Sequence, residues 1–516
     1  MIMGLRPAAL LVALGSASSQ QEGGFSCVVL GRLGGVIGGD TTSFLLAQRP
    51  LSPSSELIGL DAGSLVPGLA AFLGSQQPGS VRARQNILGA AQEGGGGALY
   101  DRALALLRQR VGGFVVTHAH LDHTAGLALV SPELVGSPKL LTGTNSTLGS
   151  LRRHLFNNEL WPNLAAEPRG GGVGELLPPH LAPFVYNRLP APASGGMLAR
   201  PFPLGMHTPA RVVTGGLSVL GWWDIPHTEP TAAVLVGAAS ESVLFFGDTG
   251  PNPPTTSAAA WQRAIDAIWL DLCRSHHGSS SDDSDPTALL PRAGLRAIFI
   301  EASFNDDDGL REEQGTLYGH LTPALLHQAL QRLCDVCPAA DMRQTHLVVM
   351  HAKPVFGQSD SGQSVGGDGD GGDGSAAELI AAQLRQRFST PPACFAGSGT
   401  DVGGSWSDRF LHTVATAKQG DTIELSSNPP VSDTGMGESD DASRLHGGDE
   451  SGVDGKEGNG EVVIWSHLLS AALGGLFLPV IRERCCGKRV SDAGVGKPAR
   501  KSKDSDDGES VGLMAE

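Results

Sequence analysis

Short apolar runs of strand length, each ended by polar or turn-forming residues, recur along most of the chain. They lie at 28–30, 42–46, 56–60, 113–116, 211–220, 231–237, 242–246, 296–301 and 346–350, and a helix is predicted over about 257–272. Short strands that alternate with helices are typical of a layered α/β domain. The pattern therefore predicts an α/β fold in which polar side chains gather at the ends of strands.

Glycine and proline interrupt this pattern in a few places rather than throughout. The 71 glycines and 33 prolines make up 104 of 516 residues, roughly a fifth of the chain against a usual share of about 12%. They concentrate in the stretch 167–206, in the insert 357–374 and in the acidic, Ser/Gly-rich linker 429–461. Segments of this composition bury too little apolar surface to fold alone, so we expect one domain at 25–428 that carries glycine-rich inserts.

The two ends of the chain carry candidate targeting signals. Residues 1–24 place Arg6 before an apolar run and small residues, the order of a secretory signal, with a mitochondrial presequence or an uncleaved extension as alternatives. Residues 462–481 contain no formal charge and precede a tail, 482–516, that is first basic and then acidic. This run is long enough to span a bilayer, with a packed helix as the alternative. The expected location is therefore either secreted or membrane-anchored with type I topology, or cytoplasmic.

The cysteine pattern argues against a disulfide scaffold, and the net charge argues against a nucleic-acid binder. Seven scattered cysteines do not form the dense pattern of a disulfide scaffold, and the isolated pair Cys334 and Cys337 indicates an ordinary helix end, with a structural zinc site as the lesser alternative. Lys+Arg 37 against Asp+Glu 53 leaves a net charge of −16. Nucleic-acid binders need a clustered basic surface, so we expect a small anionic substrate that is bound through a local cation, most simply a metal ion.

The densest group of chemically active side chains lies directly after the apolar run 113–116. His118, His120, Asp122 and His123 follow one another there in close succession. His118 and His120, two residues apart, can share one ion in an extended segment, and the other two can reach a second ion from the following turn. Nitrogen and carboxylate ligands suit zinc, with manganese or iron as alternatives. The sequence therefore predicts a metal centre at this strand end.

This His-Ala-His-Leu-Asp-His run resembles the signature of the metallo-β-lactamase superfamily. The other landmarks of that superfamily follow in its order: Asp61 in a short turn, the isolated His227, Asp248 in Gly-Asp-Thr, and His351 after an apolar strand. The resemblance implies a metallo-β-lactamase-like αββα sandwich, in which two mixed sheets are flanked by helices. It also implies two divalent ions, with zinc as the first candidate. One ion would be held by His118, His120 and His227, the other by Asp122, His123 and His351, and Asp248 would bridge both. His207 competes with His227 as the third histidine.

Within the superfamily, several stretches resemble the class II cyclic-nucleotide phosphodiesterases, the fungal low-affinity and bacterial type. They lie at 29–46, 118–132, 154–163, 299–304 and 317–323, and the resemblance covers residues 25 to about 428. It implies that cAMP, and cGMP as a second candidate, is hydrolysed to the nucleoside 5′-monophosphate by a hydroxide shared between two ions. The insert at 187–210 leaves the nucleotide preference open.

The resemblance also gives roles to side chains that are not needed as ligands. His320, in a Gly-His-Leu-Thr turn, would stabilise the phosphoryl group or protonate the leaving oxygen, with a structural histidine as the alternative. Glu301 would orient His320 or serve as a buried ion-pair or capping carboxylate. Asn157 and Trp161 would bind substrate together with His320, and Asp122 would take part in catalysis as well as metal binding.

Two other functions share parts of this ligand order. tRNase Z enzymes have Gly-His-Ser-Thr where this chain has His320 followed by Leu and Thr, but they need a basic surface for tRNA. A fold retained as a non-catalytic scaffold would predict lost ligands, and none is missing. The expected partner is therefore a small cyclic nucleotide and no nucleic acid, while a membrane contact through 462–481 and a dimer stay open.

Overall fold

The structure is a computed structural model. It describes residues 23–426 except for 36–38, 89–97, 168–176, 179, 191–196, 204–215, 239–240, 252–256, 278–293, 307–317, 339–340, 354–373, 397–404 and 414. The chain divides into two units, Met1–Met436 and Gly437–Glu516, and the second lies outside the described residues. So do His207, the segment 462–481 and nearly all of 1–24, so the predicted domain boundaries stay predictions. Among the described residues, no helix is both long and apolar enough to cross a membrane.

The first sheet has eight strands in the order β15-β1-β2-β3-β4-β5-β7-β6. Pairing is antiparallel from β15 to β3 and parallel from β3 to β6, so the sheet is mixed. Its strands are β1 (Phe25–Gly31), β2 (Ser43–Gln48), β3 (Leu57–Leu60), β4 (Val111–Val115), β5 (Lys139–Gly143), β6 (Ala165–Ala166), β7 (Phe184–Arg188) and β15 (Thr422–Leu425).

The second sheet has seven strands in the order β14-β13-β12-β11-β10-β9-β8. It is parallel from β14 to β11 and antiparallel from β11 to β8. Its strands are β8 (Met197–Pro203), β9 (Ser218–Ile225), β10 (Thr231–Ala238), β11 (Glu241–Phe246), β12 (Gly294–Glu301), β13 (His346–Met350) and β14 (Leu411–His412). Of the run predicted at 211–220, residues 211–215 lie outside the described residues; β9 begins at Ser218 and continues through two buried tryptophans to Ile225.

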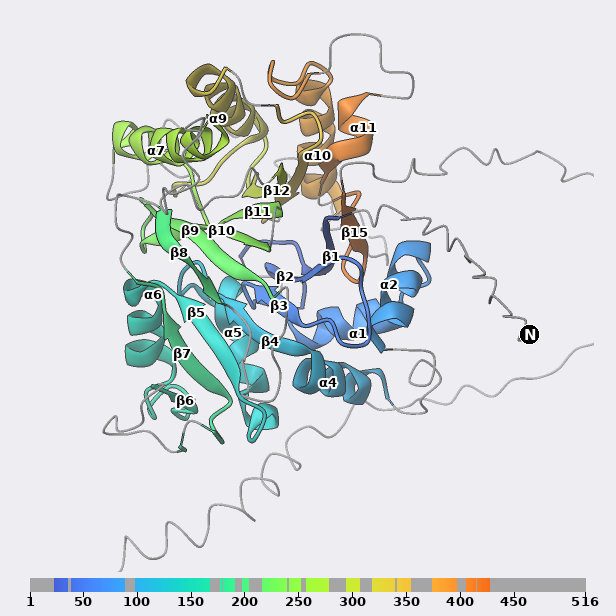
Figure 1. The fold of residues 1–516 in the computed structure, drawn as a ribbon, viewed down its shortest axis with the longest axis vertical. Coiled ribbons are helices and arrows are strands. Elements are labelled where there is room, and N and C mark those ends of the chain that lie inside the picture. Colours follow the sequence, from blue (N-terminus) through green and yellow to red (C-terminus); the bar gives the residue numbers. More distant parts are fainter. Residues whose placement is uncertain are drawn as a thin grey trace, which may run out of the picture. The chain divides into compact units, whose positions relative to one another are not determined.

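Helices cover the outer face of each sheet (Figure 1). One group packs on the first sheet: α1 (Val66–Gly74), α2 (Pro78–Leu88), α4 (Leu99–Arg110), α5 (Leu121–Val130) and α6 (Asn145–Ser150). The other packs on the second sheet: α7 (Ala258–His277), α9 (Pro323–Val336) and α10 (Gly374–Phe388). Short helical turns complete the described elements: η1 (Ser131–Leu134), η2 (Leu151–Leu155) and α11 (Trp406–Phe410).

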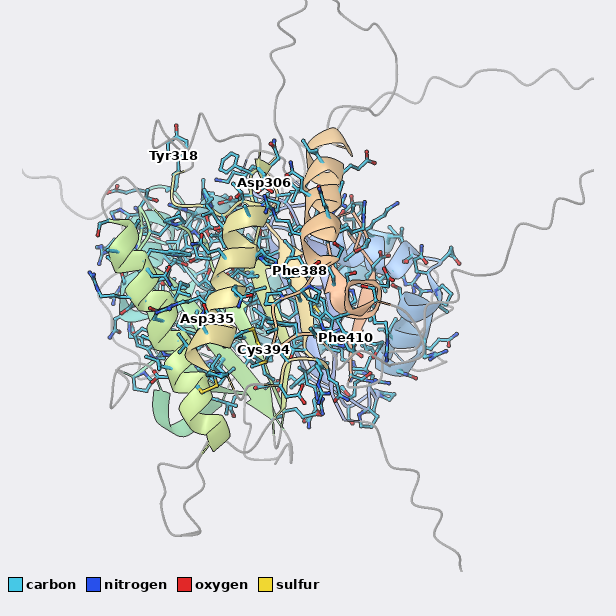
Figure 2. All side chains as sticks on the ribbon, turned by 90° about the horizontal axis from the view of Figure 1, so that it is seen from above. Asp306, Tyr318, Asp335, Phe388, Cys394 and Phe410 are labelled. Carbon is cyan, nitrogen blue, oxygen red and sulfur yellow. A yellow bond between two sulfur atoms is a disulfide. The ribbon has the colours of Figure 1, made fainter. Side chains whose placement is uncertain are left out.

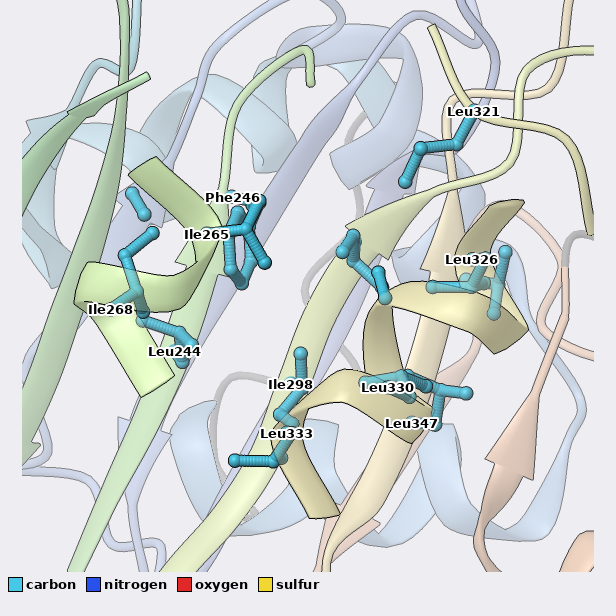
Figure 3. Packing of buried hydrophobic residues seen from close by; sticks show 14 of the residues in the cluster. Leu244, Phe246, Ile265, Ile268, Ile298, Leu321, Leu326, Leu330, Leu333 and Leu347 are labelled. Carbon is cyan, nitrogen blue, oxygen red and sulfur yellow. The ribbon is translucent and has the colours of Figure 1, made fainter. Parts of the chain in front are cut away.

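The two sheets face each other across a core that neither could bury alone. Phe44 of β2 meets Phe245 of β11 and Phe299 of β12, with ring centroids 6.2 and 5.4 Å apart. On the outside of the second sheet, Figure 3 shows Ile265 and Ile268 of α7 and the leucines of α9 packed over β11, β12 and β13. Because sheet faces and helix stripes must both be covered, the layers stack as helix, sheet, sheet, helix. The predicted αββα sandwich is confirmed.

Two disulfides correct the interpretation of the cysteines. Cys337, at the end of α9, is bonded to Cys273 of α7, and Cys334 is bonded to Cys394, which follows α10. The bonds hold α9 to the segments on either side of it, which lie side by side in Figure 2. Both sulfurs of the Cys334/Cys337 pair are therefore consumed, and neither a zinc site nor an unmodified helix end describes them. The pairing was hidden because each partner is about 60 residues away in sequence.

Candidate active site

Strand ends bring the predicted site residues together at one edge of the sandwich. β11, β12 and β13 are parallel, and β9 runs in the same direction because it and β11 are each antiparallel to β10. Ligand sites of α/β sheets form where the carboxyl ends of strands meet. These ends carry His118 and His120 after β4, His227 after β9, Asp248 after β11, Glu301 closing β12 and His351 after β13.

The turn from β4 into α5 shapes the histidine-rich motif. His120 has an extended backbone (φ −61°, ψ 148°) and stands at the N-cap position of α5, so His118 and His120 precede the helix. Asp122 and His123 lie in its first turn, where a carboxylate is favoured by the helix dipole. The motif thus presents one pair of side chains from an extended segment and one pair from a helical turn, as the sequence predicts.

The nitrogen and oxygen atoms of these residues form two adjoining groups around Asp248. In the first, His118 Nε2 lies 2.9 Å from His120 Nδ1, and Asp248 Oδ2 lies 3.5 Å from His118 Nε2 and 3.8 Å from His227 Nε2. In the second, Asp248 Oδ1 lies 3.0 Å from His123 Nε2 and 3.3 Å from His351 Nε2. Each carboxylate oxygen of Asp248 therefore faces a different group of histidines.

The donor set fits divalent metal ions. Tetrahedral zinc with ligands at about 2.0–2.1 Å places those ligands roughly 3.3 Å from one another, close to the separations observed. Burial, followed by the charge of His118, lowers the pKa of His120 to about 4, and burial lowers that of His227 to about 3. Both imidazoles are therefore neutral at pH 7 and have a lone pair available for a cation. The part of the chain that the structure describes holds four overlapping groups of three side chains that could bind a metal ion, and His320 belongs to two of them.

Buried carboxylates oppose this histidine cluster. Burial by itself raises the pKa of Asp248, but the charges of His351, His123 and His118 outweigh burial and hold that pKa well below its usual range. The same balance acts on Asp122, where a hydrogen bond from His351 and the charge of His123 outweigh burial. Both side chains therefore stay ionised at neutral pH, as metal ligands must be.

A second layer of contacts orients the histidines. Asp61, buried and in the left-handed backbone region (φ 52°), accepts hydrogen bonds from the Thr117 backbone N–H (2.8 Å) and from His123 Nδ1 (2.7 Å). Ser303 Oγ lies 3.0 Å from His351 Nδ1. In each case the bonded Nδ1 leaves Nε2 directed into the cluster, and such outer contacts fix the tautomer and orientation of metal-binding histidines. The sequence motif indicates Asp61 under the site but gives no role to Ser303, which lies two residues after Glu301.

Glu301 and His320 form a buried pair beside the metal-binding groups. Both carboxylate oxygens of Glu301 lie within 3.0 Å of His320 Nδ1, and Oε1 also accepts a hydrogen bond from the Thr249 backbone N–H at 2.5 Å. Burial raises the pKa of Glu301, but the charge and hydrogen bond of His320 outweigh it and lower that pKa to about 2. This contact is consistent with the predicted orienting role of Glu301, which stays a prediction. His320 Nδ1 also lies 4.0 Å from Asp248 Oδ2.

Lys353 lies at the site although no sequence motif gives it a role. Its Nζ lies 2.7 Å from His320 Nε2, on the opposite side of the imidazole from Glu301. The residue stands two positions after His351, within a stretch that the motif already covered. The contact between Lys353 and His320 becomes visible only in the tertiary structure, where the two segments that carry them lie close together.

Asn157 and Trp161 make structural contacts of their own. Asn157 Oδ1 accepts hydrogen bonds from the backbone N–H groups of Glu159 and Leu160, which closes a turn. The Trp161 indole donates to Ser131 Oγ at 3.0 Å and packs against the core under the first sheet. These contacts account for both residue types without a ligand, and their role in substrate binding stays a prediction, as do the individual ligand assignments above.

Comparisons with known proteins agree on one family. The model of the class-II cAMP phosphodiesterases matches residues 81–174. A Yersinia pestis protein named "Probable 3′,5′-cyclic-nucleotide phosphodiesterase" is 26% identical over 69% of this chain and 86% of its own length. An Aliivibrio fischeri 3′,5′-cyclic-nucleotide phosphodiesterase is 28% identical over 65% of this chain and 83% of its own length.

A solved structure, that of unliganded yeast PDE1, aligns with 71% of this chain and 95% of its own length, at 17% identity and a TM-score of 0.49. The relatives span most of the described domain, and the family model covers the segment that contains the His118–His123 motif. This chain is therefore similar to the class-II cyclic-nucleotide phosphodiesterases in sequence.

Proposed function

We propose that this chain hydrolyses cAMP, and cGMP as a second substrate, to the nucleoside 5′-monophosphate with the help of two divalent ions, zinc first among them. The observation that carries the proposal is the carboxylate of Asp248, which offers one oxygen to each of two histidine groups. The names of the Yersinia and Aliivibrio relatives supply the substrate class.

The described residues divide naturally between two ions. His118, His120 and His227 would hold one, Asp122, His123 and His351 the other, and Asp248 both. When bound, such a pair of ions lowers the pKa of a shared water and neutralises charge on a phosphodiester. Asp61 and Ser303 would keep the histidine Nε2 atoms directed inward while this occurs.

His320 is the group that we assign to the leaving oxygen. Its Nδ1 is held by the ionised Glu301, so the proton on that nitrogen is retained and Nε2 is the atom that can meet substrate. A proton or hydrogen bond from Nε2 to the 3′ oxygen or the phosphoryl group would ease cleavage of the 3′ ester bond. The ring is buried beside Asp248, which keeps it next to the reacting phosphate.

The test is turnover by the purified full-length chain, with cAMP, cGMP and a tRNA precursor as substrates. We expect 5′-AMP from cAMP, loss of activity after chelation, and recovery with zinc. Chromatography separates 5′-AMP from 3′-AMP, and formation of 3′-AMP would contradict the assignment of the leaving oxygen. Cleavage of the tRNA precursor in place of cAMP would support the tRNase Z alternative, and no turnover of any substrate by the zinc-loaded chain would support a scaffold.

A further inference from the structure

A lysine stands at the edge of the metal-binding groups in a position that no ligand role explains. The backbone N–H of Lys353 donates to the Ser303 carbonyl at 2.9 Å, and its ammonium lies 5.9 Å from the centroid of the Phe304 ring. The side chain is only partly buried and reaches His320 Nε2. Its stem is thus fixed by the same turn that carries Glu301 and Ser303, while its charged end stays accessible from the site.

The hydrogen-bond capacity of this ammonium is only partly used. A lysine ammonium carries three donors and no acceptor, and the bond to His320 uses one of them. Within the described ranges, no carboxylate forms an ion pair with Lys353. Burying part of a cation without a partner is costly, so the remaining donors favour an anionic ligand.

Charge balance points to the phosphate as that ligand. Asp61, Asp122, Asp248 and Glu301 carry four negative charges, which two divalent ions would just neutralise. The cyclic phosphodiester adds one negative charge, and its 5′-monophosphate product carries close to two at pH 7, since the second phosphate pKa is about 6. A fixed cation therefore stabilises the bound product, and the transition state that leads to it, more than it stabilises the bound substrate.

We propose that Lys353 is a phosphate-binding residue of the active site, whose ammonium donates to a non-bridging phosphate oxygen beside His320. This inference rests on the proposed function. While the site is free, the ammonium donates to the lone pair of His320 Nε2, and the arriving phosphate takes over that donor. Nε2 is then free to take up a proton from solvent, which it can pass to the leaving oxygen. Lys353 would then both bind the phosphate and prepare His320.

The experiment compares the zinc-loaded Lys353→Met and Lys353→Arg variants with the wild-type chain. Hydrogen bonds to charged groups contribute about 1.5–3 kcal/mol, so loss of the ammonium should weaken 5′-AMP binding in calorimetry by roughly 10- to 100-fold. Binding of adenosine, which has no phosphate, should change by less than about 2-fold. Lys353→Arg should restore part of the 5′-AMP affinity, and the zinc content should stay at the wild-type value.

Two controls separate direct contact from indirect effects. Lys418→Met removes an exposed lysine of the loop before β15 and should leave 5′-AMP binding unchanged. In a His320→Ala background, Lys353→Met should still weaken 5′-AMP binding, because the contact to phosphate does not run through the imidazole. The Michaelis constant for cAMP should rise less than the dissociation constant of 5′-AMP, since the product carries more charge.

Several outcomes would overturn the assignment. They are unchanged 5′-AMP affinity in Lys353→Met, equal losses for 5′-AMP and adenosine, loss of zinc, or an effect that disappears once His320 is absent. In the last case Lys353 would be a positioning residue for His320 and not a phosphate ligand. Failure of the proposed function looks different, because the wild-type chain itself would then neither hydrolyse cAMP nor bind 5′-AMP.

Discussion

At the scale of single residues, the chemistry of this site depends on side chains that serve two partners. The two oxygens of Asp248 face separate histidine groups, and Glu301 meets His320 on one side and Ser303, which contacts His351, on the other. A substitution at such a position removes more than one contact. The substitution should therefore change more than one property of the site, whereas a substitution at a residue with one partner should change only one.

Asp248→Ala should cost both metal and rate. The variant leaves two cations without their shared carboxylate, and because loss of even an outer contact of a ligand costs about 10- to 100-fold, we expect turnover to fall by more than about 10²-fold. Metal analysis should find fewer than two zinc equivalents. The contrasting variant His320→Ala should keep both ions while kcat falls about 10²- to 10⁴-fold, the usual contribution of a positioned acid. Near-normal turnover with two zinc ions in Asp248→Ala would contradict the bridging role.

Gly34 controls the position of His351 from the opposite side. A Cβ atom at residue 34 would lie 2.5 Å from His351 Cε1 and 2.6 Å from Nε2, closer than packed atoms approach. Gly34→Ala should therefore displace the His351 ring and weaken zinc binding at the Asp122, His123 and His351 group by roughly 10- to 100-fold. Competition against a chelator measures this affinity. Gly216→Ala, where a Cβ meets nothing within 4 Å, is the matched control, and equal zinc affinity in the two variants would show that the ring tolerates the contact.

At the scale of elements, buried His346 and half-buried His412 form a pair that joins the two sheets, and His346 stands at the start of the strand that His351 follows. His346 of β13 lies 2.9 Å from both His412 Nε2 of β14 and the carbonyl of Ser426, which follows β15 of the other sheet. A carbonyl only accepts, so His346 Nε2 carries the proton and Nδ1 accepts from His412. Burial lowers the pKa of His346 to about 4, and burial together with His346 lowers that of His412 to about 3. The pair is neutral in the folded chain.

This pair should make the fold sensitive to acid. In the unfolded chain a histidine takes up a proton near pH 6.5, whereas His346 in the folded chain takes one up only near pH 4. Its stabilising effect is therefore complete above pH 6.5 and is lost as pH falls toward 4, by about 2 kcal/mol at pH 5. Thermal unfolding between pH 7.5 and 5 measures this loss.

The double variant His346→Gln with His412→Gln should show a smaller loss of stability over the same pH interval. His180→Gln, at an exposed histidine, should match the wild-type chain. All three proteins keep the same candidate metal-binding residues, so the comparison isolates the pair. Parallel pH curves for the double variant and the wild-type chain would rule out His346 and His412 as the source.

At the scale of the whole molecule, the candidate metal-binding residues come from both sheets. Asp61, His118 and His123 follow strands of the first sheet, and His227, Asp248 and His351 follow strands of the second. Ions held there would bind the folded arrangement and not the unfolded chain. The disulfides around α9 act separately, on the outer helices of the second sheet.

Removal of the metals should therefore lower the thermal stability of the whole domain. A ligand present at a thousand times its dissociation constant stabilises the folded state by about 4 kcal/mol, so we expect chelation to lower Tm by several degrees and zinc to restore it. Calorimetry with parallel metal analysis checks this. An unchanged Tm in a chain shown to be metal-free would mean that ligands from the two sheets do not share ions.

The sequence by itself determined what is local. Apolar runs and the turns that end them predicted β1 to β4 and β10 to β13, and one dense motif with its spaced companions predicted the ligand types and their order. Such features depend on periodicity and on neighbours within a few residues. The end of β9 shows the limit: the strand continues to Ile225, five residues beyond the predicted end at 220, because a largely buried apolar run does not mark its own end.

The tertiary structure alone decided what depends on packing between distant segments. The stacking of two sheets, whose strands are far apart in sequence, decides three contacts of the site. It decides which oxygen of Asp248 faces which histidines, and it brings Asp61 to His123 and Lys353 to His320. The same holds for the partners of Cys334 and Cys337. Contacts of about 3 Å between residues tens to hundreds of positions apart do not show in the periodic pattern of apolar and polar residues. They arise only when the burial of apolar faces brings those strand ends to one edge.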